Sequence, residues 1–135
     1  MNPATYLAGL PAFLAYFGVA VLLLAAFAYL YTHITPYKEW SLIKANNPAA
    51  ATAYGGSIVG FVLPLHSAIS NSVNLLDCVL WGIVALVVQI LTFLVLRLLI
   101  RDLPSRIQHG EMASAIFVAA LSIAVGILNA ASMTY

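Results

Sequence analysis

Charged side chains are scarce in this sequence. Lys, Arg, Asp and Glu together make up 7% of its 135 residues, whereas a soluble domain carries about 25%. Hydrophobic residues make up 64% and the mean hydropathy is +1.04, so the chain has too little polar surface to coat a soluble globule. The composition therefore predicts an integral membrane protein and excludes soluble enzyme folds. The net charge of +1 and the lack of a basic run with interleaved aromatics exclude nucleic acid as a partner.

Cysteine is almost absent as well. A single cysteine, Cys78, can form neither a disulfide within the chain nor a metal site with two thiolate ligands. His33 and His109 fall in or beside loops, far along the helices from His66, so we expect no metal site and no cofactor. The sequence also lacks a Ser-His-Asp order, a Cys-His pair, a phosphate-binding glycine loop and paired catalytic carboxylates. We therefore expect that the chain is not an enzyme.

Long apolar runs, in contrast, occur four times. A spanning helix needs about 20 mostly apolar residues, because each residue rises about 1.5 Å and the hydrocarbon core is about 30 Å thick. The only charges inside these runs are Asp77, Arg97 and Glu111, each near an end, where it can reach the headgroups. The sequence therefore predicts an all-α integral membrane protein with four transmembrane helices at about residues 12–32, 49–70, 77–99 and 111–133.

The basic residues predict the orientation of these spans. All of them fall in the first and third connections or at the adjoining helix ends: Lys38, Lys44, Arg97, Arg101 and Arg106. Because cytoplasmic loops carry an excess of Lys and Arg, we expect the first and third loops in the cytoplasm and both termini in the periplasm. Amphipathic rings, which prefer the membrane boundary, gather at the first of these loops: Tyr29, Tyr31, Tyr37 and Trp40.

The chain contains a weak internal repeat. Moving it by 64 residues places Gly18 on Gly82 and Ser41 on Ser105. In both halves a bulky helix leads to a charged loop, then to the pattern Ile-x-x-x-x-x-Ala-x-Ala and a helix rich in Gly, Ala and Ser. Since each unit has two spans, the copies share one orientation. We therefore predict one membrane domain, residues 1–135, built from two tandem parallel helix hairpins at about 12–71 and 76–135.

Three segments carry a family resemblance: EWSLIKANNPAAATAYGGSIVGFVLPLHSAIS, LWGIVALVVQ and the ending AVGILNAASMTY. They resemble the YjfL-type bacterial inner-membrane proteins, a domain-of-unknown-function family. The resemblance implies a four-span inner-membrane protein of two repeats without an established activity. It also implies genomic neighbours of the phage-shock and ATP-grasp ligase types, and hence a cytoplasmic partner of the envelope-stress type. Asn46 departs from the glycine expected there, but asparagine can adopt the left-handed turn that Gly110 would adopt in the second repeat.

Small residues recur at helical spacing on two of the spans. In lipid, helix association relies on close packing of small residues and on interhelical hydrogen bonds. These faces are therefore expected to point into protein, either within the four-helix bundle or between the chains of a homo-oligomer, while the bulkier faces contact membrane lipids. The second span contributes Gly56, Gly60 and Ser67, and the fourth contributes Ala115, Ala119, Ser122, Gly126 and Asn129.

Polar residues at membrane depth are costly and are usually functional or interfacial. A candidate intramembrane site thus comprises His66, Asp77, Gln89 and Asn129. A histidine near an aspartate can relay a proton or sense pH. In the alternative interpretation His66 bonds a backbone carbonyl, Asp77 caps the third helix, and the two amides form interhelical hydrogen bonds.

A basic surface is the remaining candidate. Arg97 and Arg101 lie one helical turn apart, and Arg106 follows them in the next loop. These side chains are candidates for binding anionic lipid headgroups or an acidic cytoplasmic partner. The alternative is that they only set the topology and bind no ligand.

Taken together, these features predict a scaffold rather than a catalyst. The expected function is a structural or interaction component of an envelope-related system that oligomerises through spans two and four. The alternative is an oligomeric channel or transporter subunit for a small solute or ion, lined by the Gln89 and Asn129 faces with His66 and Asp77 at its outer mouth. A third possibility is a lipid-binding protein that uses Arg97 and Arg101.

Overall fold

The computed structural model of the chain describes residues 3–133, apart from the side chain of residue 6. These residues form helices only: α1 (Pro3–Ile34), α2 (Glu39–Lys44), α3 (Pro48–Asn71), α4 (Leu75–Leu99), α5 (Leu103–Gln108) and α6 (Met112–Ala131). Four of them, α1, α3, α4 and α6, are long and apolar enough to cross a membrane. The predicted all-α fold class with four candidate spans is therefore confirmed.

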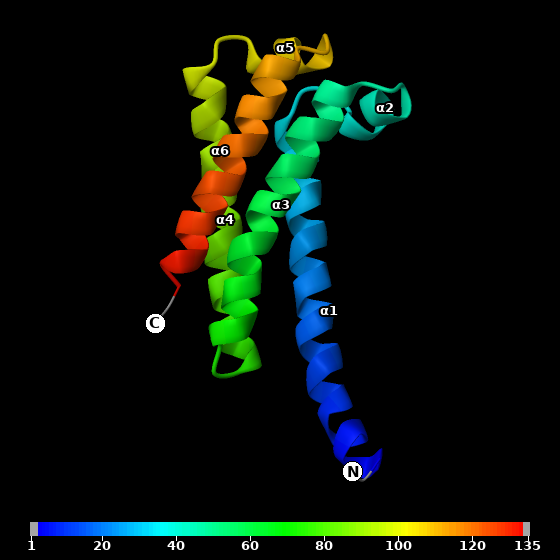
Figure 1. Cartoon of the computed structure of the whole chain (residues 1–135), viewed down its shortest axis with the longest axis vertical. Helices are drawn as coiled ribbons and strands as arrows, with labels where there is room; N and C mark the ends of the chain where they lie inside the picture. Colours follow the sequence, from blue (N-terminus) through cyan, green and yellow to red (C-terminus); the bar gives the residue numbers. More distant parts are fainter. Residues whose placement is uncertain (1–2, 134–135) are drawn as a thin grey trace.

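The first long helix differs most from its predicted span. The prediction began at residue 12, after Pro11, whereas α1 continues through this proline to Pro3. A proline inside a helix removes one backbone donor, and the apolar sequence on both sides of Pro11 continues the helix. With 32 residues, α1 is about 48 Å long at about 1.5 Å per residue. Its N-terminal part therefore extends beyond the other helices, at the end opposite α2 and α5 (Figure 1).

Side-chain caps fix where the middle helices begin. The Asn47 side chain accepts hydrogen bonds from the backbone N–H groups of Ala49 and Ala50 at 3.0 and 3.2 Å, and Pro48 follows as the first residue of α3. Asn74 accepts from the Asp77 N–H at 2.8 Å, and Asp77 accepts from the Val73 N–H at 3.1 Å. Asn74 is therefore the N-cap residue of α4, because its bond satisfies a donor that a helix leaves unpaired at its start. Asp77 lies in the first turn of α4 and supports this start through its bond to Val73.

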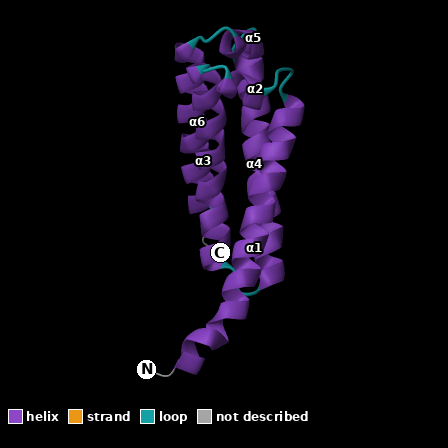
Figure 2. Ribbon diagram, turned by 90° about the vertical axis from the view of Figure 1, so that its right-hand side faces the viewer, coloured by secondary structure: helices purple, strands orange, loops and turns teal. Residues whose placement is uncertain are grey.

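The four long helices form two layers. Figure 2 shows α3 and α6 in one layer and α1 and α4 in the other, with the short helices α2 and α5 at the same end of the bundle. α3 contacts all three other long helices, whereas α6 contacts only α3 and α4 closely. Aromatic rings pack in the core. Phe27 of α1 stacks on Phe61 of α3 across the two layers, with ring centroids 4.7 Å apart, and Tyr31 of α1 lies 4.7 Å from Phe93 of α4 within one layer.

The second and third helices of each half begin 64 residues apart. α2 begins at Glu39 and α5 at Leu103, while α3 begins at Pro48 and α6 at Met112. The turns before α3 and α6 also correspond, because Asn46 and Gly110 both have positive φ angles, of 66° and 84°. The left-handed turn expected at Asn46 is therefore present. These offsets support the tandem repeat, whose arrangement remains a prediction. The last two residues of the predicted second repeat, 134–135, lie outside the described part of the chain.

Candidate functional site

The small-residue faces of α3 and α6 pack against each other within one chain. A Cβ atom added to Gly56 would lie 2.6 Å from Ala119 Cα, and one added to Gly60 would lie 2.7 Å from the Ser122 carbonyl carbon. One added to Gly126 would lie 2.9 Å from the Gly60 carbonyl carbon. Real Cβ contacts are longer than these distances, so only glycine allows the two backbones to approach this closely.

The remaining small residues complete this contact. Ser67 donates a hydrogen bond to the Ala130 carbonyl at 2.9 Å, and Ala115 and Ser122 are buried between the helices. The sequence left open whether the small-residue faces of α3 and α6 pair within one chain or between chains. In the structure they pair with each other within one chain. Pairing several chains through these same faces would require α3 and α6 to separate.

Two of the four candidate intramembrane residues lie together. Gln89 of α4 is 3% exposed, and its amide donates to the Ser122 carbonyl of α6 at 3.1 Å. The Asn129 amide approaches the Gln89 side-chain oxygen and the Ala85 carbonyl, each at 3.5 Å. This arrangement links α4 to α6 and leaves the buried amide of Gln89 hydrogen-bonded, as buried polar groups require.

His66 and Asp77 are not brought into that group. The imidazole of His66 is exposed on α3 and lines a cavity of about 280 Å³ between α1 and α3. The Asp77 carboxylate accepts a hydrogen bond from the Val73 N–H at the start of α4. Within residues 3–133 the two side chains share neither a hydrogen bond nor an ion pair, so the structure does not assemble a His–Asp relay.

The three arginines have separate surroundings. Arg97 donates to the Ile34 carbonyl at the end of α1 at 3.0 Å. Arg106 donates to both carboxylate oxygens of Glu111, at 3.0 and 3.1 Å, and to the Arg101 carbonyl at 2.8 Å. The Arg101 side chain is 93% exposed and lies 3.9 Å from the Asp102 carboxylate, a distance and exposure at which an ion pair contributes little. Arg101 therefore has the most accessible charge of the three.

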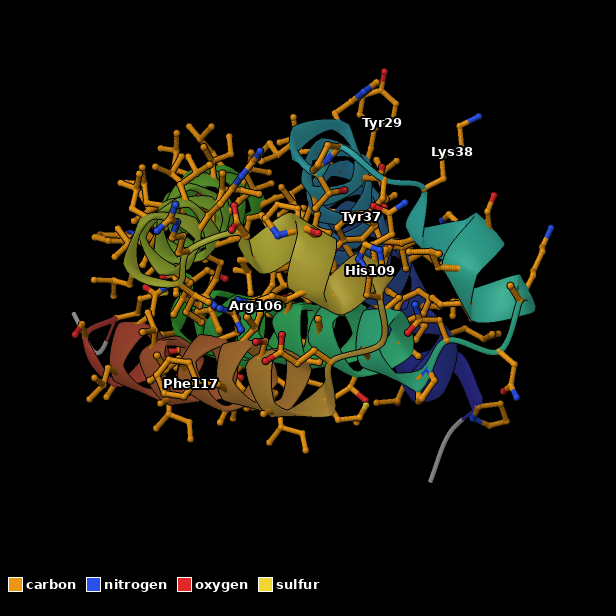
Figure 3. All side chains as sticks on the ribbon, turned by 90° about the horizontal axis from the view of Figure 1, so that it is seen from above. Tyr29, Tyr37, Lys38, Arg106, His109 and Phe117 are labelled. Carbon is orange, nitrogen blue, oxygen red and sulfur yellow. The ribbon has the colours of Figure 1, made fainter. Side chains whose placement is uncertain are left out.

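A polar cluster at the α2 end of the bundle was missed in the sequence. Glu39, the first residue of α2, is 1% exposed, and its carboxylate is hydrogen-bonded to the Thr35 hydroxyl. Tyr31, Tyr37 and Tyr54 are buried around it. In the view from this end, Tyr37 lies over the bundle while Lys38 points away from it (Figure 3). Tyr31 and Tyr37 are thus core residues of the bundle, and their depth in the membrane stays a prediction.

The surroundings of Glu39 disfavour its charged form. Burial raises the pKa of the carboxyl above its usual range, although hydrogen bonds from Thr35 and from the backbone act in the opposite direction. Burial also raises the pKa of Tyr37, and the nearby Glu39 carboxylate adds to this increase. Among the described residues, three buried polar atoms here lack a hydrogen-bond partner: Glu39 Oε2, Tyr31 OH and Tyr54 OH.

A cavity of about 290 Å³ adjoins this cluster. Its walls come from the end of α1, the following turn and α2: Thr32, His33, Tyr37, Lys38, Glu39, Trp40 and Ser41. Several of these residues are exposed, so the cavity reaches the surface. The repeat contained a signal for this site, because Glu39 corresponds to Leu103, an apolar residue that is 0% exposed. A carboxyl at a position that is leucine in the other half is a candidate for burial.

The fold and these contacts define a multi-pass membrane protein whose helices pair through small residues. The match of residues 5–133 to the family model "Domain of Unknown Function (DUF350)" shows that the chain belongs to this family. It is 43% identical to the UPF0719 inner membrane protein YjfL of Escherichia coli K12 over 124 residues, which are 92% of this chain and 94% of the relative. The same values hold for YjfL of Escherichia coli O157:H7.

A more distant relative comes from a second bacterium. The UPF0719 transmembrane protein YshE of Bacillus subtilis is 34% identical over 85 residues, 63% of each chain. No solved structure matches the chain. The family resemblance predicted from the three segments is therefore confirmed, and the chain is a multi-pass inner-membrane protein.

Proposed function

We propose that this chain is a structural or interaction component of an envelope-related system and that it self-associates in the inner membrane. The observation that carries the proposal is a difference between the two halves. A groove between α4 and α6 is open, whereas α4 covers part of the corresponding surface between α1 and α3, at Phe27 and Tyr31. The natural occupant of the open groove is the corresponding helix of a second chain.

The open groove consists of two adjoining cavities of about 360 and 370 Å³ along α4 and α6. Val88 and Val125 border both cavities. The other lining residues are mostly apolar: Trp81, Val84, Leu91, Val95, Leu96, Leu99, Leu121, Leu128 and Met133, with the polar Thr92, Asn129 and Ser132 among them. Such a surface accommodates apolar side chains of another helix or the acyl chains of lipids.

Corresponding residues in the first half are buried. Leu91 and Val95 of the open groove are 54% and 51% exposed, whereas Phe27 and Tyr31, which precede them by 64 residues, are each 1% exposed. α4 covers this surface, since Phe93 packs on Tyr31 and Gly82 lies against Leu23 and Leu65 of α1 and α3. The two grooves therefore differ in the part that contains Phe27 and Tyr31, which a helix covers in the first half only. At Phe17, Ala20 and Leu24 the first groove is open as well.

The helix that corresponds to α4 is α1. Gly18 of α1 corresponds to Gly82, but a Cβ atom on Gly18 would meet nothing within 4 Å. On the same side, Val21 and Tyr29 are 47% and 62% exposed. We infer that this face of α1 packs into the α4–α6 groove of a second chain. Because two different surfaces meet, the contact is head-to-tail and produces a closed ring or an open row of chains.

Disulfide cross-linking tests this contact. Leu23 lies against Gly82, so its counterpart Val87 is expected to lie against Gly18 of the neighbouring chain. Gly18→Cys and Val87→Cys are prepared separately, each with Cys78→Ala, and are oxidised in lipid alone and as a mixture. The expected result is a covalent dimer in the mixture only. Gly18→Cys mixed with Ile127→Cys, whose residue is 55% exposed on another side of α6, is the control and should remain monomeric.

Other outcomes decide against the proposal. Dimers from each variant alone would indicate a symmetric interface and exclude the head-to-tail contact. A monomeric mass for the wild-type chain in native lipid, without cross-links in the mixture, would leave the groove to lipid and overturn self-association.

A conduit lined by Gln89 and Asn129 has less support. Gln89 is 3% exposed and its amide is committed to the Ser122 carbonyl, so its polar group points into the helix contact rather than toward a solvent path. We therefore favour the scaffold over the conduit, with self-association through α1 and the α4–α6 groove in place of the predicted contact through spans two and four.

A further inference from the structure

If Glu39 is ionised, the Thr35 hydroxyl has four acceptors around it and one hydrogen to donate. The Thr35 hydroxyl, which has one hydrogen, contacts a Glu39 carboxylate oxygen and also lies 3.3, 3.2 and 3.4 Å from the carbonyl oxygens of Tyr31, Thr32 and Tyr37. A hydroxyl can donate only once and accepts through its lone pairs. A hydrogen on the Glu39 carboxyl would let the acid donate to Thr35, and Thr35 could then donate to a backbone carbonyl.

Apart from the Thr35 hydroxyl and the backbone, the donors nearby do not bond the Glu39 carboxylate. The hydroxyls of Tyr31 and Tyr54 are buried without a hydrogen-bond partner, as is Glu39 Oε2. Arg97, the cation that approaches this region from α4, donates to the Ile34 carbonyl instead. A buried carboxylate without an ion pair is strongly disfavoured, whereas a neutral carboxylic acid is far less costly to bury. The corresponding position of α5 holds Leu103, a buried side chain without charge.

We propose that Glu39 is a proton-binding site, which holds its proton at neutral pH and exchanges it with solvent through the cavity at the α1–α2 turn. The neutral acid donates its hydrogen bond to Thr35. On release, the proton passes from the carboxyl to water in the cavity and leaves a carboxylate that must be hydrated there. The site thus couples the docking of α2 to the pH on this side of the membrane.

Titratable and charged groups on every neighbouring element bear on this equilibrium. Tyr31 from α1, Tyr37 from the turn and Tyr54 from α3 add no positive charge near neutral pH. Arg97 from α4 favours the carboxylate but is held by Ile34. His33 and Lys38 line the cavity, where the positive charge of Lys38 assists release of the proton to solvent rather than its retention in the buried cluster.

Infrared spectroscopy of the protein in lipid tests the proposal directly. A protonated carboxyl has a carbonyl band that is separate from the amide and carboxylate bands, and the chain has only four Asp and Glu residues. At neutral pH the wild type should show this band, and Glu39→Gln should remove it. Glu111→Gln, which removes a carboxylate paired with Arg106, is the matched control and should leave the band unchanged.

A second variant makes the result independent of the folding of Glu39→Gln. Thr35→Val removes the hydrogen-bond partner but keeps the carboxyl, so the band should remain and move to the higher frequency of a less strongly bonded acid. Absence of the band in wild-type protein at neutral pH overturns the proposal. So does a band that persists in Glu39→Gln, or one whose frequency does not respond to Thr35→Val.

Discussion

Gly56 of α3 and Ala119 of α6 touch so closely that a Cβ atom on Gly56 would lie 2.6 Å from Ala119 Cα. Gly55, the preceding residue, has nothing within 4 Å of the same added atom. Two adjacent glycines therefore have opposite packing requirements, although both lie in the same turn of α3. This difference separates the effect of backbone contact from the effect of glycine on helix propensity.

Gly56→Ala should destabilise the α3–α6 pair. The methyl group forces the two backbones apart, and such overpacking costs about 1–3 kcal/mol. Gly55→Ala should be neutral or stabilising, because alanine favours a helix by roughly 1 kcal/mol over glycine. Unfolding of both variants in mixed micelles measures the difference. Equal stability of the two variants would mean that α3 and α6 do not pack through Gly56.

A second prediction concerns Asn47, which joins the two halves. Its side-chain oxygen caps α3, while its amide donates to the carbonyls of Ile107 and Gln108 at 3.3 and 3.1 Å. Asn47→Asp keeps the cap but points a carboxylate at two carbonyl oxygens. Loss of the cap in Asn47→Ala should lower the free energy of unfolding by about 1 kcal/mol. We expect Asn47→Asp to lower it by at least as much. An aspartate variant as stable as wild type would show that the cap alone matters.

Much of the fold could be predicted from the sequence. The long apolar runs predict four spanning helices because the membrane requires a fixed length of apolar chain. The small faces of α3 and α6 were expected to meet protein, and Asn46 was expected to adopt a left-handed turn, because each follows from local stereochemistry. Whether small faces pair within or between chains depends on long-range packing, which helical spacing does not encode.

The Glu39 cluster shows where sequence reasoning failed. The basic residues of the first loop were interpreted as topology signals and the tyrosines as boundary residues, which leaves the acidic residue between them without a role. Burial of Glu39 depends on how α2 folds back onto the end of α1. Hydropathy does not indicate how α2 folds back, whereas the correspondence of Glu39 with the apolar Leu103 indicates that the position is a candidate for burial.

The stability of the protein should fall as the pH rises through the folded-state pKa of Glu39. Burial raises that pKa in the folded chain. The contribution of Glu39 to stability is therefore complete when the pH is below its unfolded-state pKa, about 4.3. This contribution decreases at higher pH and is lost once the pH exceeds the folded-state pKa. Unfolding measured across pH should show this decrease in wild type and a flatter profile in Glu39→Gln. Identical profiles for the two proteins would contradict a raised pKa.

Lipid binding should depend on Arg101 more than on Arg106. The Arg101 side chain is 93% exposed, whereas Arg106 is paired with Glu111, and a basic residue near an anionic surface contributes about 1 kcal/mol. Arg101→Gln should therefore reduce retention of anionic lipid in native mass spectra several-fold, and Arg106→Gln should change it less. Unchanged lipid retention in Arg101→Gln would remove the lipid-binding interpretation of this surface.

Self-association should be blocked by a bulky residue at Gly18. This position has open space around it within one chain, so Gly18→Leu should leave the fold of the single chain intact. In the proposed head-to-tail contact, however, the leucine would meet the neighbouring α4, as a side chain at Gly82 would meet Leu23. Gly9→Leu, at a glycine that is also open but lies farther toward the N-terminus of α1, is the control. Native mass measurement in lipid should then give smaller assemblies for Gly18→Leu and wild-type assemblies for Gly9→Leu. If both variants assemble as wild type does, α1 does not occupy the α4–α6 groove.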